Sequence, residues 1–326
     1  MVVPQGTLLG LLLFIVLIND VGFAEINNNE FKSYRKNLES LNRLHLKYVD
    51  DFTVLEAINM KKSLINVPDR PRPDQFHART GHHLPTENSE VYNQLLRTKE
   101  YADANDMKIN AKKTKLMIFN PCVSKDFQPD FNLEGKDLEC VDETKLLGVV
   151  VRTDLKWHSN TETMVKKAFK KLWMLKRLQN LGASTSDLIE VYTKQIRSLV
   201  EIAVPVWQGA ITRIERNSIE RVQKCALHII LGNHYVSYKK ALETLKLEDL
   251  ETRRQKMCLN FALKATKSDK FSKWFTKNKK TNTRHKKEYY ENFARCERFK
   301  KSPLNHLTKV LNEHVHDAIA IIPVIL

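Results

Sequence analysis

The spacing of apolar residues divides the chain into a front part with short apolar runs and a back part with helical periodicity. In the front part, residues 44–48 alternate apolar and polar side chains, and residues 52–55 resume an apolar, β-prone run. Alternation with a period of two is typical of a strand, and two such runs joined by a short connection predict a hairpin. We therefore predict a hairpin whose tight turn, Val49-Asp50-Asp51, carries two carboxylates.

Further elements follow in the front part. Helical spacing predicts a helix over residues 90–105, and short apolar runs predict strands at 107–109, 116–119 and 146–151. Residues 66–90 hold four of the ten prolines, which indicates an exposed loop.

The back part, from about residue 160 to 265, reads as successive helices without a strand. Its first segment has an apolar stripe at helical spacing, formed by Met164, Val165, Ala168, Phe169, Leu172, Trp173 and Leu175. Ser184 or Ser186 is expected to cap the next helix, which continues through Tyr192 and Ile196. A third helix is predicted over residues 216–231, and Gly232 should end it.

The charge of the chain indicates which class of partner it binds. The 326-residue chain has 54 Lys and Arg against 38 Asp and Glu, a net charge of +16. Residues 166–177 carry six basic residues and no acid, and residues 264–301 carry fourteen basic residues and four acids, with aromatics between them. This pattern favours a polyanionic partner, nucleic acid before membrane. The alternative, a solvated charged face that packs one aromatic side, stays open.

The first twenty residues allow two interpretations. Residues 8–18 form an apolar run like that of a signal peptide, but no basic residue precedes it. The same run suits a buried helix that follows the polar turn Pro4-Gln5-Gly6-Thr7. The five cysteines are widely spaced and odd in number, which favours reduced thiols and an intracellular protein over a secreted one.

Four motifs, read together, resemble one enzyme family. Tyr48-Val49-Asp50-Asp51 resembles the Y-x-D-D box of reverse transcriptases. VPQGTLLGLLLFIVLIND (3–20) is similar to the motif that precedes the box, NDMKINAKKTKLMIF (105–119) to the motif that follows it, and KLLGVVVRTDLKW (145–157) to the strand that grips the primer. Their order resembles that in the non-LTR (LINE-type) retrotransposon enzymes. The later segments KLWMLKRLQNLGAS, VPVWQGA and IERVQKCALHIILG extend the resemblance over nearly the whole chain.

The resemblance implies an RNA-directed DNA polymerase that uses a two-metal Mg²⁺ site. Asp50 would be a metal ligand, and Asp51 would add charge and coordination beside it. Tyr48 would lie near the primer end. The implied partners are an RNA template, a DNA primer and deoxynucleoside triphosphates.

Two further site regions follow from the resemblance. Gln5 and Gly6 would form a turn that contacts the template and the incoming nucleotide. Lys113 is the candidate for neutralising or protonating the leaving pyrophosphate, and Lys112 and Lys115 compete with it for this role. The resemblance also implies that the apolar run at 8–18 is a core helix of the palm.

The chain also departs from the family's pattern. The family has an earlier palm strand with another metal-binding Asp, and this sequence starts two residues before Val3, so we expect that strand and the fingers to be missing. Leu11 stands where the family has a proline. We therefore expect a fragment with an incomplete Mg²⁺ site and impaired synthesis.

The sequence thus predicts an α+β fold: a partial antiparallel palm sheet with packed helices over residues 1–155, a helical thumb-like domain over 156–265 and a basic C-terminal segment over 266–326. The alternative function is a non-catalytic nucleic-acid-binding remnant whose surface is formed by residues 162–181 and 264–301. A secreted protein is the third and weakest hypothesis, and no association with a membrane is expected.

Overall fold

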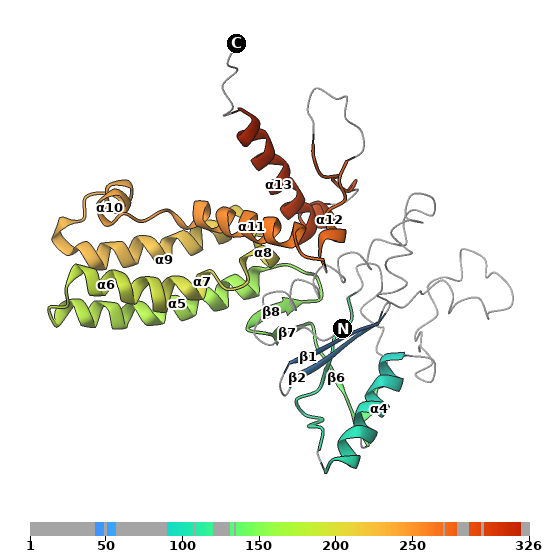
Figure 1. Ribbon diagram of the computed structural model, residues 1–326. Helices are drawn as coiled ribbons and strands as arrows, with labels where there is room; N and C mark the ends of the chain where they lie inside the picture. The colour runs from blue at the N-terminus through green and yellow to red at the C-terminus, as the bar shows by residue number, and fades with distance from the viewer. Residues whose placement is uncertain are drawn as a thin grey trace, which may run out of the picture. The chain divides into compact units, whose positions relative to one another are not determined.

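A computed structural model describes residues 43–48, 51–56, 90–106, 108–119, 131–133, 135–269, 271–278, 287–294 and 297–320. These residues combine helices with small two-stranded sheets, which is compatible with the α+β class (Figure 1). They fall into two compact units, divided between Thr144 and Lys145.

The first unit contains the predicted hairpin. Strands β1 (Arg43–Tyr48) and β2 (Asp51–Glu56) pair antiparallel, with Tyr48 opposite Asp51. Asp51 is therefore the first residue of the second strand rather than part of the turn. Helix α4 (Glu90–Ala104) packs beside β2 and confirms the helix predicted over 90–105.

The other strands of this unit are very short. Strand β3 (Lys115–Leu116) pairs in parallel with β6 (Glu139–Cys140), and β4 (Asn132–Leu133) pairs antiparallel with β5 (Lys136–Asp137).

The strand prediction for residues 107–109 is wrong, because residues 108 and 109 belong to no strand, and the one at 116–119 holds only at Leu116. A turn at Asn110 replaces regular pairing: its carbonyl oxygen accepts hydrogen bonds from the Lys113 and Thr114 backbone N–H groups.

The apolar run predicted as one strand over residues 146–151 is a hairpin instead. Strand β7 (Glu143–Leu146) pairs with β8 (Val149–Arg152) across Leu147 and Gly148, whose φ angles are 47° and 89°. Positive φ at two successive central residues is what a type I′ hairpin turn requires. The single-strand prediction failed because an apolar leucine occupies a turn position. Val149 and Val151 are buried.

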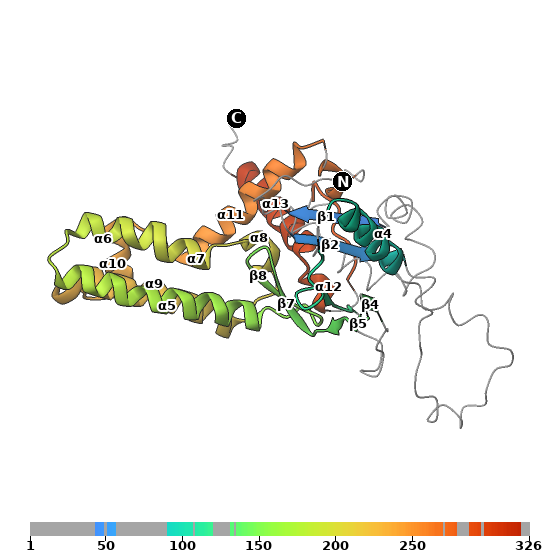
Figure 2. The same ribbon diagram turned by 90° about the horizontal axis from the view of Figure 1, so that it is seen from below.

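The second unit is built mainly from helices, and the described residues between 158 and 266 contain no strand. Its elements are α5 (His158–Asn180), α6 (Thr185–Val191), the π-helix η3 (Tyr192–Arg197), α7 (Ser198–Val200), α8 (Val204–Trp207), α9 (Arg213–Leu231), the 3₁₀ turn η4 (Gly232–His234), α10 (Tyr238–Leu245) and α11 (Leu250–Thr266). Helices α5 and α9 lie side by side in both views (Figures 1 and 2).

Local capping chemistry explains where these helices begin and end. The Ser184 hydroxyl accepts a hydrogen bond from the Asp187 N–H, so Ser184 rather than Ser186 caps α6. Thr212 and Glu215 form a reciprocal capping box, which starts α9 at Arg213, three residues before the predicted start. Gly232 ends α9 as predicted, with φ of 52°.

The core of the second unit lies between the long helices. Its members are apolar side chains with almost no exposure: Leu175, Leu188, Ile196, Val200, Trp207, Ile219, Val222, Ala226 and Leu227. Trp207 donates a hydrogen bond from Nε1 to the Ile202 carbonyl oxygen at 2.8 Å, so its buried polar atom is paired.

The C-terminal part joins this unit through α13 (Pro303–Ala320), which packs against α11 and α8. It also contains the short helices η5 (Ser272–Trp274) and α12 (Glu297–Lys300) and an isolated bridge between Lys277 and Tyr289. A Cβ at Gly209 would lie 2.6 Å from the His306 Cβ, so glycine is needed at this approach.

Candidate functional site

The β1–β2 hairpin brings together two of the residues that the sequence singles out. Tyr48 and Asp51 are opposite each other at the end of the ladder, and Val49 and Asp50 connect them in the sequence. Asp50 itself, like Gln5 and Gly6, lies outside the described residues.

Lys113 lies in the same unit as the hairpin, in the turn that precedes β3. The Asn110 side-chain oxygen accepts a hydrogen bond from the Lys113 N–H at 3.3 Å, and the Lys113 side chain is exposed. Of its two competitors, Lys112 is also exposed, whereas Lys115 forms an ion pair with Glu139. Exposure leaves the ammonium groups of Lys112 and Lys113 accessible to a phosphate.

The sequence predicts that metal binding in this region would depend on the two aspartates, Asp50 and Asp51. Mg²⁺ prefers oxygen ligands, and adjacent carboxylates supply the right donor type. Among the described residues, no group of three or more His, Cys, Asp and Glu side chains is arranged to hold a metal ion.

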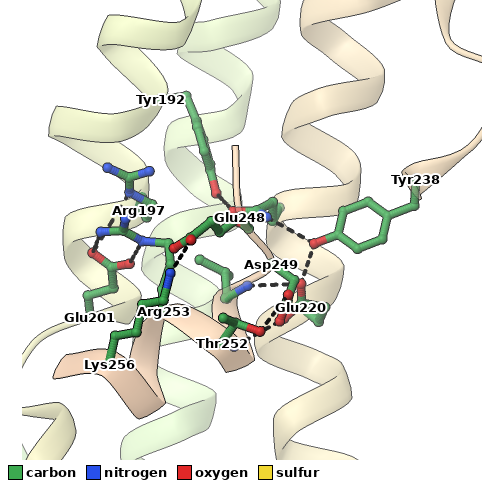
Figure 3. Close-up of polar contacts among 12 residues, drawn as sticks. Tyr192, Arg197, Glu201, Glu220, Tyr238, Glu248, Asp249, Thr252, Arg253 and Lys256 are labelled. Atoms are coloured by element: carbon green, nitrogen blue, oxygen red, sulfur yellow. Dashed lines mark hydrogen bonds and ion pairs between the residues drawn. The ribbon is translucent and has the colours of Figure 1, made fainter. Parts of the chain in front are cut away.

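A polar network inside the second unit was not predicted from the sequence. Tyr192 donates to the Gln223 side-chain oxygen, and the Gln223 amide donates to the Tyr238 hydroxyl and to the Glu248 carbonyl oxygen, both at 2.9 Å. Tyr238 in turn donates to Glu220. Figure 3 shows Tyr192 and Tyr238 pointing toward this centre from different helices.

The network is a scaffold rather than an acid–base site. Burial raises the pKa of Tyr192, and burial together with the Glu220 hydrogen bond raises the pKa of Tyr238. Both phenols therefore stay protonated at neutral pH and act as fixed donors. Gln223 is completely buried, and with all three of these contacts satisfied it costs the core little.

Two ion-pair clusters hold neighbouring helices together. Arg253 of α11 donates from Nε to Glu201 at 2.7 Å, and this bond raises the pKa of the arginine (Figure 3). Arg254, fully buried, donates from Nε to Gln208 and from its terminal nitrogen to Glu251, at 2.8 and 2.7 Å. Glu251 supplies the opposite charge that a buried guanidinium requires, while the other terminal nitrogen, Nη1, is buried without a hydrogen-bond partner.

The sequence contains a signal for the polar network around Gln223. Gln223 falls on the same helical face as Ile219, Val222 and Ala226, where a polar residue is unexpected. A polar side chain on an apolar stripe indicates a buried partner, but the stripe does not say which distant residue supplies it.

The seven aromatics of the basic tail differ in exposure. Four side chains are buried and act as packing residues: Phe271, Phe275, Tyr289 and Phe299. Trp274 is half-buried, and two are exposed: Tyr290 at 56% and Phe293 at 74%. Asn312 accepts a hydrogen bond from the Tyr289 N–H and donates one to its carbonyl oxygen, which fixes the buried tyrosine. Most of the tail's aromatic pattern therefore reports packing.

Over the part of the chain that the structure describes, no helix has the length and apolar content needed to cross a membrane. Comparisons of this chain with protein-family models, with curated proteins and with solved structures find no match.

Proposed function

We propose that the chain derives from the RNA-directed DNA polymerase of a non-LTR retrotransposon and retains the hairpin that carries the catalytic aspartates. One observation carries the proposal: the antiparallel register pairs Tyr48 with Asp51 and leaves Val49 and Asp50 as the connection. The Y-x-D-D sequence thus occupies the end of a two-stranded ladder, where adjacent carboxylates can bind divalent cations.

In this proposal the first unit corresponds to part of a palm and the helical unit to a thumb. Asp50 and Asp51 would bind Mg²⁺, which when bound supplies charge stabilisation for nucleotidyl transfer. Tyr48 would lie beside the primer end, and the exposed Lys113 would contact the pyrophosphate. Gln5 and Gly6 would contact the template. With one adjacent pair of carboxylates, cation binding should be weak.

The test measures Mn²⁺ binding by electron paramagnetic resonance on the full chain and on Asp50→Asn. We expect weak binding that Asp50→Asn removes. Asp106→Asn is the matched control, because Asp106 is an exposed aspartate of the same unit and its φ of 55° suits asparagine equally well. Identical Mn²⁺ binding by wild type and Asp50→Asn would refute the hairpin as a metal site.

A primer-extension assay on an RNA template adds a functional readout. The expected result is slow Mg²⁺-dependent incorporation that Asp50→Asn abolishes and Asp106→Asn preserves. Extension by Asp50→Asn at the wild-type rate would contradict the polymerase assignment.

The helical unit supports a second candidate function, nucleic-acid binding without synthesis. Lys166, Lys167, Lys170, Lys176 and Arg177 of α5 are all exposed. Exposed cations concentrated on one helix bind polyphosphate chains with a steep salt dependence. Binding in the absence of Mg²⁺, without primer extension, would favour this candidate over the polymerase.

A further inference from the structure

The solvent side of α5 has a narrow strip of cations with a tryptophan among them. Lys166, Lys170, Trp173 and Arg177 are separated by four, three and four residues, so they align along one side of the helix. All four are exposed. The buried residues Met164, Ala168, Leu172 and Leu175 define the opposite side.

Trp173 differs from the other tryptophans of the chain. It is 67% exposed, whereas Trp157 and Trp207 are buried and Trp274 is half-buried against Phe271. The Arg177 guanidinium carbon lies 5.4 Å from the centre of the Trp173 ring. This cation–π contact holds the indole in a defined position on the surface.

The neighbouring helix adds a second pair of the same kind. Arg221 of α9 is exposed, and its guanidinium carbon lies 6.0 Å from the centre of the Phe169 ring. Phe169 precedes Trp173 by four residues, so the two aromatic–cation pairs are neighbours along α5. The surface formed by Lys166, Phe169, Lys170, Trp173, Arg177 and Arg221 is called the α5 platform below.

One acidic side chain adjoins the platform. Glu162 forms an ion pair with Lys166 at 2.6 Å, and both side chains are about half exposed or more. Exposed pairs of this type contribute about 0.2–1 kcal/mol, so a phosphate can replace the carboxylate at little cost.

We propose that the α5 platform binds single-stranded nucleic acid, with a base stacked on Trp173 and phosphates held by the surrounding cations. This extends the nucleic-acid-binding function proposed above, and it is independent of the β1–β2 hairpin. An indole on the outside of a helix can stack on an unpaired base, but the bases of a duplex are already stacked on one another.

The chemistry of the α5 platform favours single-stranded nucleic acid over two other polyanions, an anionic membrane surface and an acidic peptide. An anionic membrane surface binds helices whose wide apolar face is free, whereas the apolar face of α5 is buried in the core. An acidic peptide would engage the cations but offers no flat ring for Trp173. The strip from Lys166 to Arg177 is about 16 Å long. At 3.4 Å per stacked nucleotide, this length matches roughly five nucleotides.

The test uses fluorescence anisotropy of labelled oligo(U), oligo(dT) and a duplex of the same length with the full chain. We expect the single strands to bind more tightly than the duplex. Trp173→Ala should weaken single-strand binding roughly ten-fold, and Trp173→Phe should restore most of the loss. Tyr101→Ala is the matched control, since Tyr101 is an exposed aromatic of α4, outside both basic segments, and should leave the affinity unchanged.

Salt dependence tests the cations separately. Lys166→Ala combined with Lys170→Ala should reduce the slope of log affinity against log salt by about 1.4, which corresponds to two phosphate contacts. The control exchanges Lys239 and Lys240, two exposed lysines of α10, for alanine and should leave the slope unchanged.

Three results would overturn the proposal. One is wild-type affinity of a folded Trp173→Ala variant for single strands, with folding checked by circular dichroism. The second is tighter binding of the duplex than of the single strands. The third is Trp173-dependent binding to anionic phospholipid vesicles without oligonucleotide binding. Nucleic-acid binding that ignores Trp173 would leave the broader binding function standing, whereas the absence of all binding would refute both.

Discussion

The helical region from α5 to α11 and the β1–β2 hairpin place their functional candidates on very different supports. The helical region has a continuous apolar core and a buried polar network, and its candidate platform faces outward from that core. The hairpin is one antiparallel pair of strands, with α4 packed beside β2.

The two regions differ in how far stability and function can be tested separately. A two-stranded sheet is only marginally stable alone, so the hairpin depends on the elements packed against it. In the helical region, exposed side chains such as Trp173 can change without disturbing the core beneath them. The platform can therefore be dissected by substitution more cleanly than the hairpin can.

The largest loss of stability is expected when a buried tryptophan is exchanged for alanine. The same exchange at an exposed tryptophan should cost much less. Trp207→Ala should destabilise the helical unit by about 3–5 kcal/mol, because the side chain is completely buried. Trp173→Ala should cost less than about 1 kcal/mol, since it removes an exposed ring and one cation–π contact. Urea unfolding followed by circular dichroism measures both, and equal losses would contradict the difference expected between a buried and an exposed tryptophan.

The second prediction concerns pH. Burial, together with the nearby Arg216 and Lys309, lowers the pKa of His306 from 6.5 to about 4, although Glu251 opposes this. The unfolded state then binds more protons between these values, so stability should fall as the pH drops from 6.5 toward 4. The full change is roughly 3 kcal/mol.

Urea unfolding at a series of pH values measures this effect. A His306→Gln variant should show a flatter profile over the same pH range. If the wild type and His306→Gln lose stability in parallel, His306 is not the responsible group.

A hairpin near the boundary of the two units provides the third prediction. Gly148 has a φ of 89°, and a Cβ there would meet no atom within 4 Å, so a side chain would add backbone strain without a clash. Gly148→Ala should cost about 1–2 kcal/mol. Gly148→Asn should cost less, because asparagine tolerates positive φ better. Thermal unfolding compares the two, and equal costs would argue against strain as the cause.

The smallest expected effect tests a helix start. Thr212→Ala removes the hydroxyl that accepts the Glu215 N–H and should cost about 1 kcal/mol. Thr212→Ser keeps the hydroxyl and should stay close to wild type in urea unfolding. A loss as large with serine as with alanine would mean that the methyl group, not the cap, matters at this position.

Local signals predicted much of this fold. Ser184, Gly232 and the alternation at residues 44–55 are short-range patterns that act through capping or pairing of neighbours, and each predicted its element. The turn at Leu147 was not predicted, because leucine is apolar and lies within a β-prone run. Its backbone nevertheless adopts a positive φ angle.

The long-range contacts could not be predicted in the same way. Tyr192 and Gln223 are 31 residues apart, and Gln208 and Arg254 are 46 apart. The periodicity of one helix does not identify the distant residue that its polar side chain contacts, because this contact depends on how the helices pack. Of the site residues, Tyr48 was predicted at a strand end and Asp51 in the turn, and the structure pairs the two at the hairpin end. Lys113 was predicted between two strands, and the structure has it in the turn that precedes β3. Gln5, Gly6 and Asp50 lie outside the described residues.

The π-helix η3 shows that the number of residues in a helical segment matters independently of their chemistry. It lies between α6 and α7 in one helical run and holds Tyr192 and Ile196 in the core. Its i→i+5 hydrogen bonds take up one residue more than an α-turn does, while the helices on either side keep their faces. Deleting one residue from Tyr192–Arg197 should therefore restore an α-turn and leave Val200 and Glu201 in their core and ion-pair positions. A deletion inside the regular helices α5 or α9 would instead rotate all that follows by about 100°. Over evolutionary time, the loss of a residue should be accepted more readily at η3 than within those helices.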